Sequence, residues 1–304
     1  MSTALLVLVF LTGLSLMLYP AVSNRWNGYH QTQAVLGYEK EIRNLSPGFL
    51  KKEIELAREY NRTVAVNGMV WKMNDTQRAE YESLLNIDGS GNMGYIEIPK
   101  LKIMLPVYHG VEERILQKAI GHIEGSSLPV GGETSHCIVS GHRGLPSSKL
   151  FTDIDQLQAG DKFLLQVLDR TLTYEVDQIR IVLPQELQDL EIDPYSDYCT
   201  LITCTPYGVN THRLLVRGHR VDNDNTDATR VTADAMRFEP VIVAPLVAAP
   251  ILFILLIYVL ISTSRWNKRR TAKRSKADIR RSIGKIASKD SRKNDSKNDT
   301  EDTE

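Results

Sequence analysis

The stretch Asp161–Leu183, DKFLLQVLDRTLTYEVDQIRIVL, decides the fold class of this chain. It is rich in Val, Ile, Leu, Thr and Tyr, which favour β-strands. Similar short runs surround it, namely MGYIEIPKLKIMLPVYHG (93–110), HCIVSGHRG (136–144), CTLITCTP (199–206) and RLLVRGHRV (213–221). Because Gly, Asp and Pro turns separate these runs and few helices interrupt them, the sequence predicts a closed or nearly closed β-barrel over residues 92–222.

Residues 24–91 form a helical region ahead of the strands. Ser46 followed by Pro47 is a typical helix start, with serine as the N-cap and proline at the first helical position. Asn74-Asp75-Thr76-Gln77 is a capping-box pattern that begins another helix, which we expect to end near Asn86. The intervening TVAVNGMVWKMND (63–75) is apolar and predicted to be non-helical. The apolar face of the first helix consists of Leu50, Ile54, Leu56, Ala57 and Tyr60.

Two uncharged stretches, Ala4–Val22 and Val241–Ile261, match the roughly 20 apolar residues of a membrane-spanning helix. The first is either a membrane anchor or a cleaved signal peptide. Ala21-Val22-Ser23 is a suitable small-residue cleavage site, but no basic segment precedes the apolar run. The second contains Pro245 and Pro250, and a buried core helix is its alternative. A basic run follows it at once, which favours a membrane span.

Charge is balanced over the whole chain, with 37 Lys and Arg against 37 Asp and Glu, but it is unevenly distributed. Residues 265–281 hold nine basic residues and one acid, whereas residues 299–304 hold four acids and no base. Because Lys and Arg beside a span stay in the cytoplasm, we expect the tail to be cytoplasmic and to touch membrane lipid. Binding of nucleic acid is the alternative interpretation of the basic cluster and is not expected. Residues 24–238 then lie outside the cytoplasm.

These features divide the chain into six segments. They are an N-terminal hydrophobic signal or anchor (1–23), a helical region (24–91), a β-barrel domain (92–222), a linker (223–240), a transmembrane helix (241–261) and a basic then acidic tail (262–304). The predicted fold class is mainly β, a closed barrel with short helices, preceded by the helical region and flanked by transmembrane helices.

The chain has three cysteines, of which Cys204 is the candidate nucleophile. Cys199 and Cys204 point to opposite faces of one straight strand, about 16 Å apart at the usual rise per residue. A disulfide between them would therefore need a sharp bend in the strand. Cys137 is expected to be a small buried hydrophobe. Cys204 ends its strand before Thr-Pro-Tyr-Gly, where its side chain reaches solvent, and a buried core thiol is the alternative.

Arg213 and His142 are the expected partners of the thiol. Arg213 opens the next strand, so pairing of the two strands would bring it to Cys204 across the base of the loop. A cysteine nucleophile usually needs an imidazole as well. Among seven histidines, His142 is favoured because it lies between two glycines in VSGHRG, after an apolar strand. No carboxylate or cysteine spacing supports a metal site at His136 and His142, and we expect neither a metal nor a cofactor.

The stretch TLITCTPYGVNTHRLLVRG (200–218) resembles the signature of the sortases, the cysteine transpeptidases of Gram-positive bacteria. SGHRG around His142 resembles the histidine motif of that family. The Cys–Arg stretch is most similar to class C, the pilin-polymerising sortases. So is the order of N-terminal hydrophobic segment, helical region, β-barrel and C-terminal transmembrane helix. The resemblance covers about residues 5–270.

The resemblance implies a membrane-bound cell-wall enzyme of pilus assembly. Cys204 would attack the Thr–Gly bond of an LPxTG-like sorting motif on a pilin subunit and form a thioacyl-enzyme. His142 would protonate the leaving amine and then deprotonate the lysine of a second pilin, which resolves the intermediate as an isopeptide. Arg213 would steady the substrate and the oxyanion. Thr203 and Thr205 flank the thiol and either contact substrate or are exposed strand-end threonines.

The chain departs from class C in one respect. Enzymes of that class commonly carry a lid with an Asp-Pro-aromatic motif ahead of the barrel, and this chain has no such motif there. Residues 64–75 occupy the expected region, so Trp71 either serves as the aromatic residue of an altered lid or packs the helical region on the barrel. Two other functions stay open. They are a housekeeping sortase that anchors proteins to the cell-wall precursor, and a membrane-anchored adhesion or scaffold module whose Cys204 is incidental.

Overall fold

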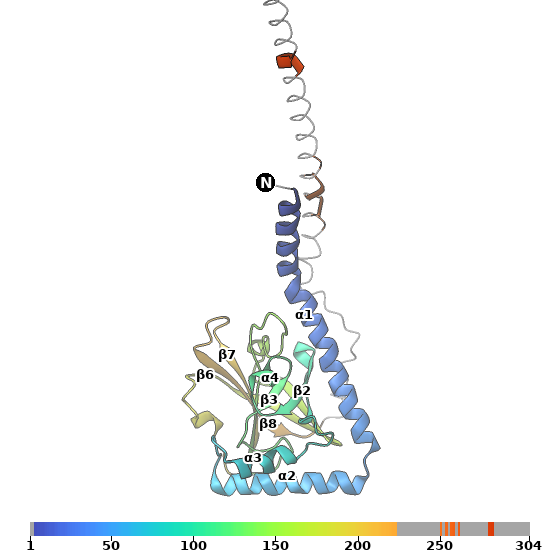
Figure 1. Cartoon of the computed structure of the whole chain (residues 1–304). Coiled ribbons are helices and arrows are strands. Elements are labelled where there is room, and N and C mark those ends of the chain that lie inside the picture. Colours follow the sequence, from blue (N-terminus) through green and yellow to red (C-terminus); the bar gives the residue numbers. More distant parts are fainter. Residues whose placement is uncertain are drawn as a thin grey trace, which may run out of the picture. The chain divides into compact units, whose positions relative to one another are not determined.

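The computed structural model describes residues 3–223 and a few isolated residues between 250 and 282 (Figure 1). The chain divides into two compact units, one formed by Tyr19–Phe238 and the other by Met1–Leu18 with Glu239–Glu304. The predicted linker, C-terminal transmembrane helix and cytoplasmic tail lie almost entirely outside the described residues.

Within residues 3–223, eight strands close into one barrel, which confirms the predicted fold class. Their order around the barrel is β1-β2-β3-β4-β7-β8-β6-β5. Four single-turn helices, η1 (Pro99–Leu101), α4 (Glu113–Leu116), η2 (Ile154–Gln156) and η3 (Gln188–Leu190), lie in the connections. The strands are β1 (Asn92–Ile98), β2 (Ile103–His109), β3 (Ile120–His122), β4 (Ser135–Ser140), β5 (Lys162–Val167), β6 (Arg170–Val182), β7 (Asp197–Thr205) and β8 (His212–Val221).

Two strand pairs of this barrel, β2 with β3 and β4 with β7, are parallel, and the other pairs are antiparallel. A parallel pair needs a long crossover connection. Between Ser140 and Asp197 the chain forms β5 and β6 before it returns beside β4. The carboxyl ends of β4 and β7 therefore lie at the same end of the barrel, although they are distant in the sequence.

The barrel interior is apolar and closely packed. Because side chains alternate across a strand, Cys199 and Leu201 of β7 point inward, whereas Ile202 and Cys204 belong to the outer face. Gly218 on β8 has no room for a side chain, since a Cβ there would lie 2.8 Å from the Phe163 ring. The buried core includes Ile96, Val107, Val139, Phe151, Phe163, Leu165, Tyr174, Leu201 and Val216.

Three helices precede the barrel, α1 (Thr3–Asn44), α2 (Pro47–Asn67) and α3 (Asp75–Ser83). Both predicted helix starts are confirmed. The Ser46 side chain accepts a hydrogen bond from the backbone N–H of Phe49, and Asn74 and Gln77 form a reciprocal capping box. Helix α3 ends at Ser83, three residues before the predicted end, because the backbone turns to an extended conformation at Leu84.

The apolar face of α2 differs from the prediction at its edge and at its end. Leu56 is 43% exposed, because the helical period places it away from the buried Ile54 and Ala57. The helix continues through Val64, which is buried, as far as Asn67. The first four residues of the segment predicted to be a non-helical lid (64–75) are therefore helical. Gly68, with φ +79°, ends the helix.

A second apolar cluster joins the helical region to the barrel. Val35, Tyr38 and Ile42 of α1 are buried in it together with the inner faces of α2 and α3. The Tyr38 hydroxyl donates to the carbonyl of Met93 at 2.9 Å and accepts from the N–H of Leu168 at 2.8 Å. In Figure 1, α2 and α3 lie together along one end of the barrel. The 24–91 region is thus packed on the catalytic domain.

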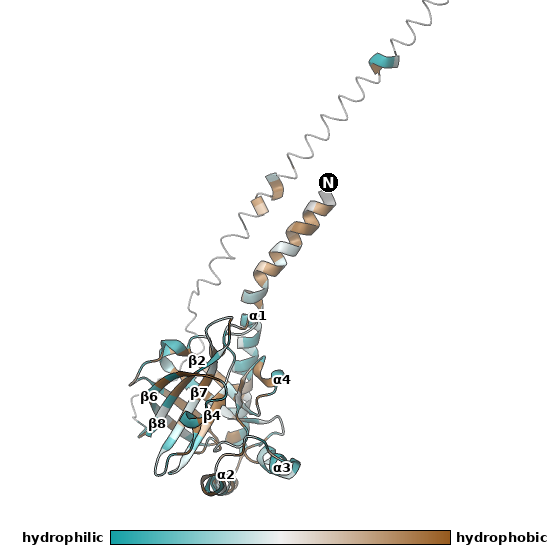
Figure 2. Ribbon diagram, turned by 90° about the vertical axis from the view of Figure 1, so that its left-hand side faces the viewer, coloured by the Kyte–Doolittle hydropathy of each residue, from teal (hydrophilic) through white to brown (hydrophobic). Residues whose placement is uncertain are grey.

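The N-terminal part of α1 consists mostly of apolar residues (Figure 2). The helix from Val7 to Asn44 is long and apolar enough to cross a membrane, by length and composition, and the apolar window is not buried by the rest of the chain. Among the described residues it is the one helix that meets this test. This finding supports the membrane segment that the sequence predicts at the N-terminus.

Candidate active site

Strand register places Cys204 opposite Arg213 and brings the segment that carries His142 to the same end of the barrel. Strands β7 and β8 pair with Cys204 directly opposite Arg213, which confirms the pairing expected from the sequence. Strands β4 and β7 pair in parallel with Ser140 opposite Ile202. His142 follows two residues after Ser140, and Cys204 lies two residues after Ile202, so both are near the carboxyl ends of adjacent parallel strands. Because neighbouring strands are about 4.8 Å apart, the strand order β4, β7, β8 gives the sequence positions His142, Cys204 and Arg213 in a row across the sheet.

Three hydrogen bonds extend this contact beyond the end of β4. The N–H of Gly141 donates to the carbonyl of Ile202 at 3.0 Å. The Thr203 hydroxyl donates to the carbonyl of Gly141 at 2.7 Å. Nη1 of Arg143 donates to the Thr205 hydroxyl at 3.2 Å. Hydrogen bonds of the residues on both sides of His142 therefore hold this loop against the end of β7.

Thr203 and Thr205 are buried and each makes one of these hydrogen bonds. Their exposed fractions are 1% and 6%, so neither is an exposed strand-end threonine, as one of the two sequence-based alternatives expected. Each hydroxyl holds a residue that flanks His142. We infer that both threonines position the histidine loop, and their contact with substrate stays a prediction.

The two glycines beside His142 are needed for different reasons. A Cβ at Gly141 would lie 2.5 Å from the Ile120 side chain and 2.9 Å from the Phe151 ring, so only glycine fits against the core. Gly144 has φ +74°, and a Cβ there would lie 2.8 Å from the ring of Tyr207. The loop is thus sandwiched between the core and the β7–β8 connection, which limits its movement.

Cys204 is the half-buried cysteine on the outer face, and the other two are buried in the interior. All three are free thiols. Cys199 faces the barrel interior and Cys204 belongs to the outer face of β7, as predicted. Cys137 was expected to be buried and is 2% exposed. The parallel register places it directly opposite Cys199, which the sequence alone did not indicate. Burial raises the pKa of the Cys199 thiol well above its usual value, so that thiol stays protonated.

Backbone carbonyls fix Arg213 at the base of the β7–β8 connection. Its Nη1 donates to the carbonyl of Asn210 at 3.2 Å and to that of His212 at 3.1 Å. Within residues 3–223 the guanidinium makes no other hydrogen bond, and its side chain is half-buried. Further N–H groups of the fork are thus available to an oxygen that arrives beside Cys204.

Three other histidines are buried and hydrogen-bonded within the protein, so they are not available to a substrate. Burial lowers the pKa of His109, and it lowers the pKa of His136 to about 4. Within the residues that the structure describes, no group of His, Cys, Asp or Glu is arranged to hold a metal ion. The ring partners are Gly91 and Leu84 for His109, Tyr81 and Ser127 for His122, and Glu191 and Thr200 for His136.

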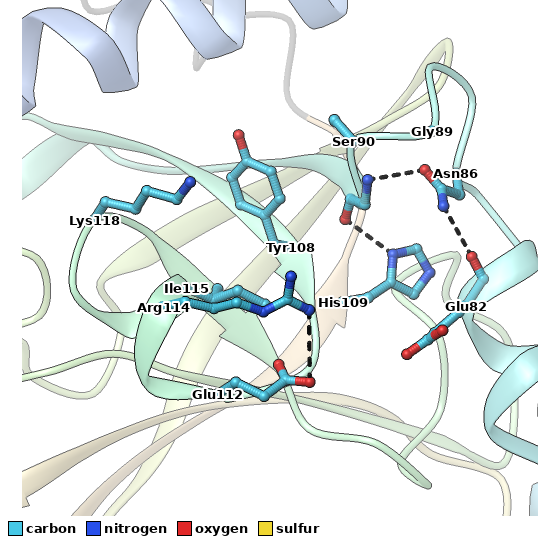
Figure 3. A pocket seen from close by; sticks show the side chains of 11 residues that line it. Glu82, Asn86, Gly89, Ser90, Tyr108, His109, Glu112, Arg114, Ile115 and Lys118 are labelled. Atoms are coloured by element: carbon cyan, nitrogen blue, oxygen red, sulfur yellow. Dashed lines mark hydrogen bonds and ion pairs between the residues drawn. The ribbon is translucent and has the colours of Figure 1, made fainter. Parts of the chain in front are cut away.

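A pocket of about 270 Å³ lies between the segment 82–91 and α4 (Figure 3). Its lining combines acids and bases, with Glu82 and Glu112 opposed by Arg114 and Lys118. None of the three residues His142, Cys204 and Arg213 lines it. We therefore place the candidate active site at the row and not at this pocket.

An apolar cluster, here called the outer cluster, lies on the same face as Cys204. Ile202, two residues before the thiol, packs there beneath Leu190 from the β6–β7 connection. Met69, from the segment between α2 and α3, is partly buried and contacts both this cluster and the helical one. Its buried members are Ile138, Val182, Leu190, Ile202 and Leu215.

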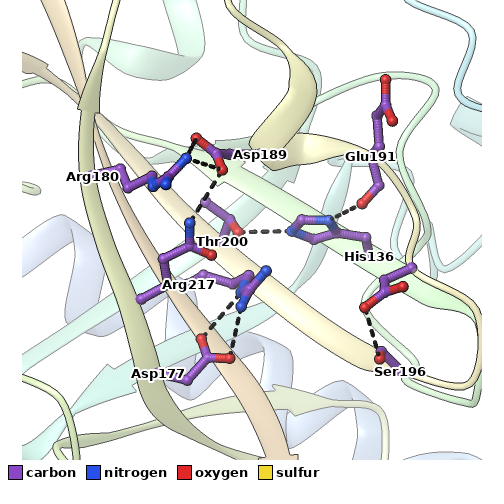
Figure 4. Close-up of polar contacts among 10 residues, drawn as sticks. His136, Asp177, Arg180, Asp189, Glu191, Ser196, Thr200 and Arg217 are labelled. Carbon is purple, nitrogen blue, oxygen red and sulfur yellow. Dashed lines mark hydrogen bonds and ion pairs between the residues drawn. The ribbon is translucent and has the colours of Figure 1, made fainter.

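Polar contacts fix the β6–β7 connection over this face (Figure 4). The Asp189 carboxylate accepts from Nη1 of Arg180 at 2.9 Å and from the Gln178 amide at 3.1 Å. Nδ1 of the buried His136 lies 2.8 Å from the carbonyl of Glu191. The connection is therefore anchored at two points beside the outer cluster.

The closed barrel, with a cysteine and an arginine opposite each other on adjacent strands and a histidine after the next strand, agrees with the family that the sequence resembles. Residues 96–221 match the family model described as the sortase domain. The chain is 55% identical to sortase C1 from Streptococcus agalactiae, covering 63% of this chain and 100% of that one, with a TM-score of 0.62. This chain therefore belongs to the sortase family.

Two further solved structures are similar. Sortase C from Clostridium perfringens, solved with the C-terminal cell wall sorting motif, is 42% identical over 63% of this chain and 100% of its own, with a TM-score of 0.57. Sortase C from Streptococcus pneumoniae, described with regard to catalysis and pilin substrate specificity, is 39% identical over 63% of this chain and 97% of its own, with a TM-score of 0.58.

Proposed function

We propose that this sortase is a class C enzyme that cleaves an LPxTG-like sorting motif between Thr and Gly and joins pilin subunits by lysine isopeptide bonds. The observation that carries the proposal is the row of sequence positions His142, Cys204 and Arg213 across the sheet. The likeness to sortase C1 of S. agalactiae supports the class. The sorting motif held by the C. perfringens enzyme and the pilin specificity ascribed to the S. pneumoniae enzyme support the substrate.

The first half of the reaction forms a thioester. The Sγ of Cys204 attacks the carbonyl carbon of the motif threonine, and Arg213 donates hydrogen bonds to the oxyanion that develops. The C–N bond to glycine then breaks, and His142 gives its proton to the leaving amine. The planar guanidinium suits this task, because two of its N–H groups can face one oxygen or two neighbouring ones.

The second half transfers the acyl group to a lysine of another pilin. The lysine arrives as a free amine and attacks the thioester carbon, and His142, now neutral, takes the proton that the nitrogen loses as the new C–N bond forms. The C–S bond breaks, Cys204 leaves as a thiolate, and an isopeptide bond remains between the two subunits. Water would give hydrolysis in place of assembly, so the site must exclude water while it holds the thioester.

Two alternatives give distinct expectations. A housekeeping sortase would transfer the acyl group to the amine of a cell-wall precursor and would form no pilin ladder. A scaffold module would leave Cys204 without a reaction, and membership of the sortase family argues against it. The class C proposal is favoured by the three sortase C structures that the chain resembles.

The proposed enzyme is held at the cell membrane with its barrel outside the cell. Helix α1 is suitable for crossing a membrane, which supports an anchor at residues 1–23. The barrel unit, the linker, the second span at 241–261 and a cytoplasmic tail at 262–304 complete the proposed arrangement. In this position the barrel meets pilins that leave the cell.

We also propose that residues 68–75 act as an altered lid. Val70 donates to the carbonyl of Gly125 at 3.4 Å, and Met69 packs on the outer cluster beside the strand of Cys204. Trp71 is 43% exposed, so it is not held in a core. A few weak contacts fit a segment that opens for substrate.

The experiment that tests the function is incubation of the full-length chain, in detergent, with purified candidate pilins. Covalent ladders on a denaturing gel are expected for the wild type and not for Cys204→Ala. Release of the motif fragment without ladders would point to the housekeeping type. An inert wild-type protein whose Cys204 reacts no faster than a free thiol would contradict the enzyme proposal.

A further inference from the structure

Nε2 of His142 is a buried nitrogen that lacks a hydrogen bond within the described part of the chain. The charged atom that faces it is Oε2 of Glu113, at 3.5 Å. Buried polar groups in native proteins are almost always paired, so an exception needs a reason. A gap of 3.5 Å lies just beyond a good hydrogen bond, which has its donor and acceptor about 2.9 Å apart.

Helix α4 presents Glu113 to this nitrogen in a defined position. Ile115 anchors the single turn in the protein, with an exposed fraction of 8%. The Gln117 amide donates a hydrogen bond to Oε1 of Glu113, which leaves Oε2 for the histidine. The neighbours Glu112 and Arg114 line the pocket of Figure 3 instead, and Glu113 does not. Glu113 thus faces His142, whereas the adjacent Glu112 faces the pocket.

Glycines allow the turn that precedes α4 to lie close to strand β3. A Cβ at Gly121 of β3 would lie 2.2 Å from the carbonyl oxygen of Gly110, so the turn that leads into α4 rests directly on β3. Strand β3 in turn pairs with β4, with Gly121 opposite Ser140. The turn that leads into α4 therefore lies on β3. The next strand is β4, whose end leads to His142, and the one after it is β7, which carries Cys204.

Another carboxylate near the histidine loop is already occupied. Asp155 forms an ion pair with Arg143, whose guanidinium also donates to Thr205. The charge of Arg143 is thereby compensated and directed away from the imidazole. Glu113, with its side chain 69% exposed, is the acid that retains an oxygen for His142.

We propose that Glu113 is a positioning residue for His142, a role that rests on the proposed function. Catalytic hydrogen bonds are often long in the free enzyme and shorten when substrate binds. As Glu113 Oε2 closes on Nε2–H, it fixes the ring tautomer so that Nδ1 faces the reacting atoms. It also stabilises the imidazolium during the interval in which His142 holds the proton. Gln117 contacts Glu113, and Glu113 faces His142, which in the proposed reaction serves Cys204.

The test compares four full-length proteins in detergent: wild type, Glu113→Gln, Glu113→Asp and, as a matched control, Glu112→Gln. The control removes an equal charge from the same turn. The readout is steady-state cleavage of a fluorogenic LPxTG peptide, with kcat and KM measured separately. Thermal midpoints verify that each variant folds. Because the Glu113 side chain is exposed, its replacement should leave the thermal midpoint unchanged.

The expected result is a kcat lower by roughly 10-fold in Glu113→Gln with KM unchanged, since orientation of a general acid–base group acts on the transition state. Glu113→Asp should recover part of the loss, and Glu112→Gln should match the wild type. A wild-type kcat in Glu113→Gln, an equal loss in Glu112→Gln, or a change in KM alone would overturn the role of Glu113 only. A wild-type chain that never cleaves the motif would overturn the proposed function and this role with it.

Discussion

At position 213, arginine and lysine would carry the same charge but differ in the geometry of their hydrogen-bond donors. The guanidinium is held by two carbonyls through one nitrogen, and the residue lies opposite Cys204 in the strand register. A lysine ammonium would carry the charge on a single flexible point. We predict that Arg213→Lys folds normally but loses about 10²-fold in kcat for motif cleavage, by analogy with the removal of one oxyanion donor. Near-normal turnover in a folded variant would rule out this role.

Part of the catalytic row could be predicted from the sequence and part could not. Cys204 and Arg213 flank one short connection between two apolar runs, so strand pairing alone makes them neighbours. His142 is brought to the thiol by the parallel pairing of β4 with β7, which depends on the order of all eight strands. Its motif and the family resemblance identified it, whereas periodicity did not. Glu113 gave no signal, because a helix of one turn has no repeating pattern.

At the scale of elements, His136 contacts the β6–β7 connection, and its protonation makes the stability of the fold depend on pH. It is 1% exposed, with Nδ1 on the Glu191 carbonyl and Nε2 2.7 Å from the Thr200 hydroxyl. Burial lowers the pKa of His136 from its ordinary 6.5 to about 4, and the charge of Arg217 acts in the same direction. The folded protein therefore resists protonation at this ring.

Between pH 6.5 and about 4 the unfolded chain binds a proton at His136 that the folded chain does not, so acid favours unfolding. We predict that His136 removes about 3 kcal/mol from the free energy of unfolding as the pH falls through that window. His136→Asn, whose amide can still reach the Glu191 carbonyl, should show a shallower pH dependence in urea unfolding. Parallel curves for the two proteins would contradict the assignment.

The segment between α2 and α3 provides a second prediction at this scale. Trp71 is 43% exposed, so we expect Trp71→Ala to speed alkylation of Cys204 and to raise hydrolysis of the sorting-motif peptide. We expect the thermal midpoint to change little, because a buried packing tryptophan would cost about 3 kcal/mol or more on truncation and this one is not buried. Labelling rate and midpoint measured on the same protein pair decide the matter. An unchanged labelling rate would remove the lid from the account.

The elements themselves were largely predictable where local chemistry decides them. Ser46 and Asn74 cap α2 and α3 because their side chains accept from backbone N–H groups near the helix start. The end of α2 was not predictable from the same rules. Val64 gains burial on the barrel, and that tertiary contact extends the helix beyond the apolar pattern to Gly68.

For the whole molecule, the two parts of α1 should contribute differently to stability. Residues from Gln31 to Ile42 are packed in the helical cluster, and Gln31 donates to Lys118 and Ser148. We predict that a chain starting at Tyr19 keeps the thermal midpoint of the full chain. A chain starting at Leu45 loses Val35, Tyr38 and Ile42 from the core, and its midpoint should fall on the order of 10 °C. Equal midpoints, measured by calorimetry in the same detergent, would contradict this division.

The central claim is that the half-buried thiol at the end of β7, and not either thiol inside the barrel, carries the acyl group. It is tested most directly by the intact mass of the full-length chain after incubation with an LPxTG peptide. We predict a mass increase equal to the peptide fragment that ends at threonine, mapped by proteolysis to Cys204. The adduct should persist in Cys137→Ala and Cys199→Ala and be absent in Cys204→Ala. An adduct on another residue, or one that forms without Cys204, would contradict the account.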